Sequence, residues 1–255
     1  MPARPQWRGK TTLLRCLLGL LEPDGGTVRV NGLALEGLSA RRRAALVAYV
    51  PQSTGTTFPF TTLDMAVMGR TPHLPVTRSP SRRDRLHALD VLSELGLAHL
   101  ADQSFASLSG GERSLAMIAR ALVQEAEILV LDEPTAALDL GNSVRVLRLV
   151  RELSARGRTV LMTTHQPDHA LHVAHRAVLL ADGRVEVDGD PRTVLTGEVL
   201  SRVYQTSVAV ASTTVPGRSA TVSSFLPLDL LPDLDPNEGT DSSQTELRQQ
   251  EGRSE

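Results

Sequence analysis

A short run near the start of the chain has the residue types of a phosphate-binding loop. Gly9, Lys10, Thr11 and Thr12 stand directly before an apolar stretch, as in a loop that opens a helix. Backbone N–H groups at a helix N-terminus cradle phosphate, a lysine offers charge to the β- and γ-phosphates, and the Thr11 hydroxyl can bind Mg²⁺. Lys10 is the only lysine beside 26 arginines, which suits a compact charge rather than a planar fork. By itself the run is a weak signal, because these residue types also meet by chance.

Two acids follow a second apolar stretch. Residues 128–131 predict a buried central strand of a parallel sheet, which carries Asp132 to its C-terminal end. There an aspartate can hold a Mg²⁺-bound water, and Glu133 is placed to polarise the attacking water as general base. The alternative is a pair of acids that only cap the next helix. It fits less well, because the acids follow the lysine run at a spacing that is ordinary for nucleotidases.

The sharpest signal is the run Ser109, Gly110 and Gly111, framed by Leu108 and Glu112. A hydroxyl and bare amides at a helix start make a second anion site. Two γ-phosphate sites in one chain predict that two chains pair head to tail, each closing on the nucleotide of the other. A simple N-cap with flexible glycines explains Ser109 but not the whole set.

Alternating strands and helices must position these groups. Apolar stretches and hairpin signals predict strands, and apolar residues three and four apart predict helices. The expected strands cover residues 27–30, 45–50, 128–131, 159–162, 177–180 and 184–187, and the expected helices cover residues 9–20, 63–68, 86–95, 115–122, 146–157 and 168–174. This order predicts an α/β fold with a mostly parallel core sheet and, from the hairpins, a partial antiparallel β part.

Composition narrows the classes of function. The net charge is −2, so the overall electrostatic field of the protein does not favour the binding of nucleic acid. No apolar run is long enough to span a bilayer. Residues 211–255 carry −5 and are rich in Ser, Thr, Pro, Asp and Gln, which predicts a disordered acidic tail. Residues 226–236 alternate Leu with Asp and Pro; an uncommitted solvated tail is favoured there over a short binding motif. Cys16 stands alone, so it forms no disulfide within the chain.

Taken in order, these runs resemble an ABC ATPase over about residues 9–200. The remaining matches are Gln52 after Val-Pro, Asp139 after Ala-Leu and His165 after Thr-Thr. The resemblance implies a P-loop NTPase fold with a helical subdomain, and therefore an ABC ATPase domain over residues 1–210. It also implies that Gln52 senses Mg²⁺ and couples to a membrane subunit, that Asp139 lies at the dimer interface, and that His165 contacts γ-phosphate.

On this basis the expected cofactors are ATP and Mg²⁺. The expected partners are a second copy in a head-to-tail homodimer and transmembrane permease subunits that contact the Q-loop and the helical subdomain, with no nucleic acid. The expected place is the cytoplasmic face of the cell membrane. The expected catalytic residues are Glu133 and His165, the metal ligands are Thr11, Gln52 and Asp132, and the nucleotide-binding residues are Gly9, Lys10, Thr11, Thr12, Gln52, Ser109, Gly110, Gly111, Asp132 and Asp139.

Two segments indicate which branch of the ABC ATPases the chain resembles. Residues 58–62 and 68–73 resemble the importer ATPases for iron-siderophore, haem and cobalamin complexes, and residues 139–142 and 163–167 fit that branch. Manganese and zinc importers remain open. A soluble ABC ATPase of DNA repair or translation is disfavoured, because the chain has neither a long coiled-coil insertion nor a second cassette.

The sequence departs from the family in the phosphate loop. The family has glycines six, three and one residues before the lysine, where this chain has Arg4, Trp7 and Gly9. Glycine serves there because the backbone needs positive φ and close approach to phosphate. We therefore expect weak ATP binding by the sequence as it stands. We also expect either a true start about thirty residues upstream, the length of a two-strand unit, or a gene fragment that is a nucleotide-impaired remnant.

Four histidines, His165, His169, His172 and His175, have a spacing that could suggest a metal site. The resemblance gives His165 a phosphate role, and the other three fall on an expected surface helix. We therefore predict no metal at these histidines.

Overall fold

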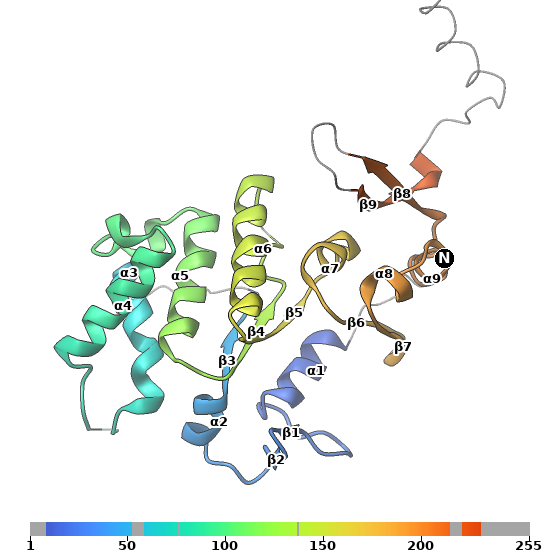
Figure 1. Cartoon of the computed structure of the whole chain (residues 1–255). Helices are drawn as coiled ribbons and strands as arrows, with labels where there is room; N and C mark the ends of the chain where they lie inside the picture. The colour runs from blue at the N-terminus through green and yellow to red at the C-terminus, as the bar shows by residue number, and fades with distance from the viewer. Residues whose placement is uncertain (1–8, 53–58, 76, 137, 215–220, 231–255) are drawn as a thin grey trace, which may run out of the picture. The chain divides into compact units, whose positions relative to one another are not determined.

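The computed structural model describes residues 9–52, 59–75, 77–136, 138–214 and 221–230. The chain divides into two compact units, Met1–Val194 and Leu195–Glu255 (Figure 1). In the first unit the helices are α1 (Lys10–Leu17), α2 (Ala40–Leu46), α3 (Thr62–Val67), η1 (Met68–His73), α4 (Arg82–Glu94), η2 (Ala98–Leu100), η3 (Phe105–Ser107), α5 (Gly110–Val123), α6 (Leu140–Ala155), α7 (Pro167–Val173) and α8 (Pro191–Val194). Its strands are β1 (Arg29–Val30), β2 (Leu33–Ala34), β3 (Val47–Val50), β4 (Ile128–Asp132), β5 (Thr159–Thr163), β6 (Ala177–Ala181) and β7 (Arg184–Gly189).

A three-stranded parallel sheet in the order β3-β4-β5 carries the fold. The chain passes from β3 to β4 through α3, α4 and α5, and from β4 to β5 through α6. Val50 pairs with Leu131, and Asp132 pairs with Thr163, so the C-terminal ends of the three strands meet at one edge. This arrangement confirms the predicted α/β fold with a parallel core sheet.

Helices cover both faces of this sheet. Leu129 and Leu131 of β4 belong to the large core that α5 and α6 complete, and Val130 packs with Leu14 and Leu18 on the opposite face. Successive side chains of a strand point to opposite faces, which explains why β4 is apolar at every position before its final acid. Burial of both faces therefore fixes the position of Asp132 at the end of the strand.

A helical group formed by α3, α4 and α5 packs beside the sheet (Figure 1). Each of these helices starts with a capping box, in which an N-cap hydroxyl and the acid three residues later bond each other's backbone. The pairs are Thr61 with Asp64, Ser81 with Asp84, and Ser109 with Glu112. An N-cap of this kind contributes about 1 kcal/mol, so all three helix starts are fixed locally by sequence.

Both predicted hairpins are confirmed. β1 pairs antiparallel with β2, and Asn31 and Gly32 between them have φ values of 50° and 80°, as a two-residue hairpin turn requires. β6 pairs antiparallel with β7, with a register shift between Leu179 and Leu180. Helix α2 was not predicted; its only clear signal is Ser39, whose side chain accepts a hydrogen bond from the Arg42 N–H. No helix in the described part of the chain combines the length and apolar character needed to cross a membrane.

The second unit differs from the sequence prediction. It contains α9 (Gly197–Tyr204), β8 (Val208–Thr214), β9 (Thr221–Pro227) and η4 (Leu228–Leu230), with β8 and β9 paired antiparallel. Disorder was predicted from residue 211, whereas that residue lies inside β8. The prediction weighed the polar composition and overlooked the Val, Thr and Phe residues that favour strands. In this unit Leu200 and Phe225 are buried; residues 231–255 of the predicted tail lie outside the described residues.

Candidate functional site

The C-terminal edge of the parallel sheet gathers the predicted chemical groups. Gln52 follows β3, Glu133 follows β4, and His165 lies two residues after β5. Helix α1, which begins at Lys10, packs on one face of the same sheet. Strand ends of a parallel sheet and helix N-termini are the usual sources of ligand-binding groups in α/β folds.

The Glu133 carboxylate is the centre of this cluster. The Lys10 ammonium lies 3.2 Å from Oε1, the Gln52 amide donates to Oε2 at 2.8 Å, and His165 Nδ1 lies 3.4 Å from Oε2. Lys10 also donates to the Thr164 carbonyl at 3.2 Å. Both side chains of the Lys10–Glu133 pair are only 18% exposed, so water screens this pair less than a surface pair. We call Lys10, Gln52, Glu133 and His165 the Glu133 cluster.

The backbone of Glu133 is held in an uncommon conformation. Its φ is 47°, a left-handed value that costs a non-glycine residue about 1–3 kcal/mol. The Glu133 N–H donates to Thr163 Oγ1 at 2.9 Å, and that hydroxyl donates to Asp132 Oδ1 at 2.7 Å. The neighbouring strand thus holds the turn that directs Glu133 into the cluster.

Asp132 is 4% exposed and has two hydroxyl partners. Besides Thr163, the Tyr49 hydroxyl donates to Oδ2 at 3.3 Å. Burial, the negative charge of Asp132 and the hydrogen bond to it raise the pKa of Tyr49. Sequence reasoning missed this role of Tyr49. The only signal available was its place on β3, the strand next to β4 in the sheet.

The predicted phosphate loop is described only from Gly9 onward, so Arg4 and Trp7 lie outside the described residues. Gly9 has a φ of 138°, which disfavours any other residue type. Its carbonyl accepts from the Leu13 N–H at 2.7 Å. Thr11 and Thr12 are exposed at the start of α1.

The second predicted anion site does not join the Glu133 cluster. Ser109 and Gly110 are exposed at the start of α5; the Ser109 N–H donates to Glu112 Oε2 at 2.8 Å, and Ser109 Oγ accepts from the Glu112 N–H at 3.3 Å. This hydrogen bonding from Ser109 lowers the pKa of Glu112. The serine-glycine turn, residues 109–111, therefore presents two of its three residues to solvent.

Gly111 and Asp139 are linked through one side chain. Gly111 is buried so closely against Asn142 that a Cβ there would overlap the Asn142 amide. Asp139 is the N-cap of α6, and its carboxylate accepts from the Asn142 backbone N–H at 2.7 Å and from the Asn142 amide at 2.9 Å. Asp139 thus lies beside the serine-glycine turn rather than at the Glu133 cluster.

One contact joins the two predicted sites. Ser114, on the next turn of α5, donates from its hydroxyl to the Pro134 carbonyl at 3.0 Å. Pro134 directly follows Glu133. The helix that begins at the serine-glycine turn is therefore hydrogen-bonded to the loop that carries Glu133.

His169 corrects the sequence interpretation of α7. It was expected on a surface helix, yet it is 8% exposed, with Nδ1 3.4 Å from the Thr135 hydroxyl and 3.3 Å from the Thr164 hydroxyl. It thus bridges the loop after β4 to the loop after β5. Burial lowers the pKa of His169; the charges of His165 and His172 act in the same direction, and Asp168 opposes them. Among the described residues, no three His, Cys, Asp or Glu side chains are grouped to hold a metal ion.

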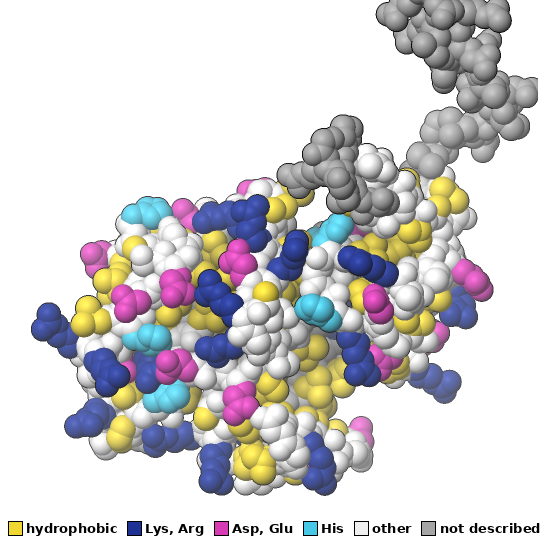
Figure 2. Space-filling model, in the orientation of Figure 1, with side chains coloured by type: hydrophobic (Ala, Val, Ile, Leu, Met, Phe, Trp, Pro, Cys, Tyr) yellow, Lys and Arg dark blue, Asp and Glu magenta, His cyan; other side chains and the backbone are white. Residues whose placement is uncertain are grey.

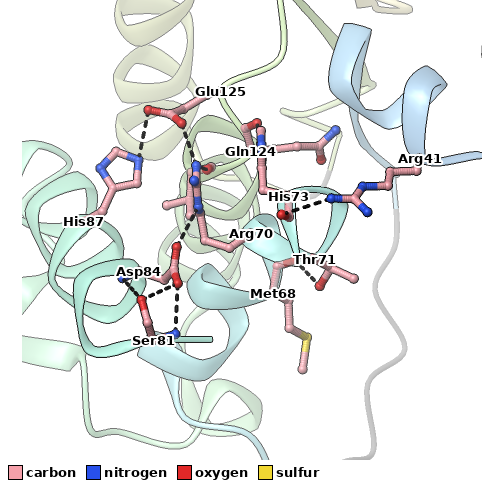
Figure 3. A network of polar contacts seen from close by, with 11 residues as sticks. Arg41, Met68, Arg70, Thr71, His73, Ser81, Asp84, His87, Gln124 and Glu125 are labelled. Carbon is pink, nitrogen blue, oxygen red and sulfur yellow. Dashed lines mark hydrogen bonds and ion pairs between the residues drawn. The ribbon is translucent and has the colours of Figure 1, made fainter. Parts of the chain in front are cut away.

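The segment η1, whose residues resemble those of the importer ATPases, is held by contacts within the chain (Figure 3). The Arg70 guanidinium bonds Asp84 of α4 at 3.0 Å and Glu125 after α5 at 2.5 Å. His73 Nε2 lies 2.7 Å from the Gln124 carbonyl, and Arg41 donates to the Pro72 carbonyl at 2.8 Å. Hydrogen bonding from Arg70 is the main cause that lowers the pKa of Glu125. Arg70 is therefore a structural link between η1, α4 and α5.

Comparisons with known proteins agree on one family. A family model described as ABC transporter matches residues 8–136. The chain is 41% identical over 217 residues to the Hemin import ATP-binding protein of Nocardia farcinica, a match that covers 84% of this chain and 73% of the relative. It is 39% identical over 209 residues to the Cobalamin import ATP-binding protein of Halobacterium salinarum. That match covers 82% of this chain and 52% of the relative, so the chain spans about half of the relative's length.

A solved structure shares the fold at useful sequence identity. It is an inward-facing conformation of a metal-chelate type ABC transporter, with a TM-score of 0.77 and 33% identity. The alignment covers 86% of this chain and 82% of that chain.

Proposed function

This chain belongs to the ABC transporter family of ATP-hydrolysing subunits, and we propose that it drives an importer for iron-siderophore, haem or cobalamin complexes. The observation that supports a catalytic role most directly is the Glu133 cluster, in which one carboxylate contacts Lys10, Gln52 and His165. The names of the relatives support the cargo class, since they import haem and cobalamin.

The side chains present suit a magnesium nucleotide. Mg²⁺ prefers oxygen ligands, and Asp132 offers a carboxylate that Thr163 and Tyr49 hold in place. The Thr11 hydroxyl is exposed at the start of α1, and Gln52 uses only its amide nitrogen toward Glu133, which leaves its oxygen available. We assign the metal to Thr11, Gln52 and Asp132; when bound, it neutralises charge on the phosphates.

Lys10 and Glu133 exchange partners in the proposed mechanism. Without phosphate, the Lys10 ammonium is paired with the Glu133 carboxylate. A phosphate at the start of α1 competes with Glu133 for that ammonium. The backbone N–H groups of Gly9, Thr11 and Thr12 donate to the same phosphate. Glu133 then loses its cation and is free to accept a proton from the attacking water, while His165 lies on the same side to contact the γ-phosphate.

A second copy of the chain completes the site. Ser109 and Gly110 are exposed, and the N-terminus of α5 favours an anion. We propose that Ser109 and Gly110, together with Gly111 and Asp139, contact the nucleotide of the partner in a head-to-tail homodimer. The dimer acts with transmembrane permease subunits at the cytoplasmic face of the membrane, because an ATPase drives import only when it is coupled to a translocation path.

Uptake in the native cell tests this function. The Glu133→Gln allele should abolish accumulation of one labelled cargo among ferric siderophore, haem and cobalamin, and Glu22→Gln, at an exposed acid of the same chain, should leave uptake unchanged. Purified Glu133→Gln protein should bind ATP but not hydrolyse it. Normal uptake of all three cargoes by cells whose Glu133→Gln protein has no ATPase activity would overturn the importer assignment.

A further inference from the structure

A hollow of about 700 Å³ lies between the second half of α6, the end of α7 and the start of α8. Its lining includes none of the residues of the Glu133 cluster. Figure 2 shows Lys, Arg and His side chains gathered over the surface that α6, α7 and α8 form. The basic and histidine residues that line the hollow are Arg148, Arg151, His172, His175 and Arg192.

The arginines of this hollow differ from other arginines of the described residues in their contacts. Arg148 and Arg151 lie three residues apart on α6 and so share one face of the helix, and Arg192 comes from α8. Within the described ranges, none of the three guanidinium groups donates a hydrogen bond or forms an ion pair. Arg70 and Arg176, by contrast, are each paired with carboxylates.

Two acids also line the hollow, so its charge is a small excess of positive over negative groups. One of them, Asp190, is already engaged, because its Oδ1 accepts from the Arg192 backbone N–H at 2.9 Å. Glu152 is the other. Three guanidinium groups against two carboxylates, one of them occupied, leave a site that attracts an anion.

We propose that this hollow binds a small organic anion with two or more phosphate groups. One guanidinium group can donate two parallel hydrogen bonds to the oxygens of a phosphate. Three such groups therefore suit a ligand with several phosphate groups better than a ligand with a single phosphate. Leu171, Val173 and Ala174 form an apolar part of the lining, which suits the organic portion of such a molecule. The volume falls within the range of about 300–1,000 Å³ that is usual for small-molecule sites.

Helix α7 connects the hollow to the nucleotide site, so a ligand bound in the hollow can influence that site through this helix. Its C-terminal residues line the hollow, and its first residue, Pro167, lies two positions after His165. The seven-residue helix also carries buried His169. An effect of the bound anion on ATP hydrolysis, transmitted through α7, rests on the proposed function, whereas the binding of the anion does not.

Calorimetric titration with inorganic tripolyphosphate tests the site. The full-length Lys10→Ala protein should be used, because this change weakens phosphate binding at the start of α1. The Lys10→Ala protein should bind tripolyphosphate, and adding Arg151→Gln and Arg192→Gln should weaken that binding by about tenfold or more. The matched control is Arg184→Gln, an exposed arginine of β7 outside the hollow, which should leave the affinity unchanged.

Three outcomes would overturn the proposal. One is no tripolyphosphate binding by the Lys10→Ala protein, and another is binding that the two hollow substitutions leave unchanged. The third is equal affinity for tripolyphosphate and ATP, because the apolar lining predicts a gain from an organic group. Arg151→Lys should give an intermediate affinity, since lysine keeps the charge and loses the paired hydrogen bonds. Failure of ATP hydrolysis in the wild-type protein would count against the proposed function alone.

Discussion

The start of α1 and the start of α5 were both predicted to receive an anion, yet their surroundings differ. At α1, Lys10 meets Glu133, and the side chains that follow β3 and β5 converge on this carboxylate, which itself follows β4. At α5, Ser109 and Gly110 face solvent, and the polar groups of Ser109 are bound by Glu112 of the same turn. A site with converging charges can do chemistry within one chain. A site with exposed, locally bonded groups gains a function when another molecule is placed against it.

The substitution Glu133→Gln has the largest expected effect among those that distinguish the α1 region from the α5 region. Loss of the general base should lower ATP hydrolysis by about 10²- to 10⁴-fold while ATP binding persists, because the amide cannot accept the proton. Steady-state phosphate release and equilibrium ATP binding measure the two effects. Glu22→Gln is the exposed control, and a hydrolysis rate within tenfold of wild type would remove Glu133 from its catalytic role.

Gly111→Ala tests how tightly the α5 site is built. The new methyl group would overlap the Asn142 amide, so we expect a loss of about 1–3 kcal/mol in unfolding free energy, measured by urea denaturation. Asn142→Ala in the same protein should restore part of the loss by making room. Gly25→Ala is the matched control, because no atom lies within 4 Å of its Cβ position. Equal losses in the single and double variants would show that the Asn142 contact is not the cause.

Ser109→Ala and Ser81→Ala form a matched pair that isolates intermolecular function. Both serines cap a helix through the same capping box, so each change should cost about 1 kcal/mol of stability. Only Ser109→Ala should also weaken ATP-dependent dimerisation and hydrolysis, because only that hydroxyl is proposed to face the nucleotide of a partner. Sedimentation with ATP and an ATPase assay measure both. Parallel loss of hydrolysis in the two variants would reduce Ser109 to a helix cap.

The smallest effect concerns pH and belongs to the region around Glu133. Because burial lowers the pKa of His169, the unfolded chain, with an ordinary pKa near 6.5, binds a proton at pH values where the folded protein does not. This contribution to stability is fully present above about pH 6.5 and is lost as the pH falls from there through the lowered pKa. Urea unfolding at several pH values should show a flatter dependence for His169→Gln. His175→Gln, an exposed histidine two residues after α7, should keep the wild-type slope, and an unchanged slope in His169→Gln would contradict the assignment.

Local sequence patterns predicted the strands of the parallel sheet and the helices α1, α3, α4, α5, α6 and α7, because each depends on nearby residues. The β4 strand, its two terminal acids and the α5 helix start could all be recognised from spacing. The partners of those groups could not be recognised. Tyr49 reaches Asp132 from a strand 83 residues away in sequence, and Arg70 links η1 to α4 through Asp84, a contact that the sequence pattern did not indicate.

His169 and β8 show two further limits. His169 was predicted to lie on a surface helix, because the sequence pattern does not report the two threonine hydroxyls that neighbouring loops bring to the ring. A polar composition predicted disorder over residues that pair as β8 and β9, because composition alone does not report the pairing of two neighbouring strands or the burial of Phe225. Contacts between segments far apart in sequence therefore decide the part of the site that patterns leave open.

The pairing of Lys10 with Glu133 also gives the protein a natural chemical reporter. The chain contains a single ε-amine, and it lies at the entrance to the proposed catalytic centre, with its side chain 18% exposed. An acylating reagent therefore finds one lysine target, and mass spectrometry of the peptide that carries it reads the occupancy of the centre directly. Protection of that amine by nucleotide would measure affinity without a label, a radioisotope or an engineered cysteine.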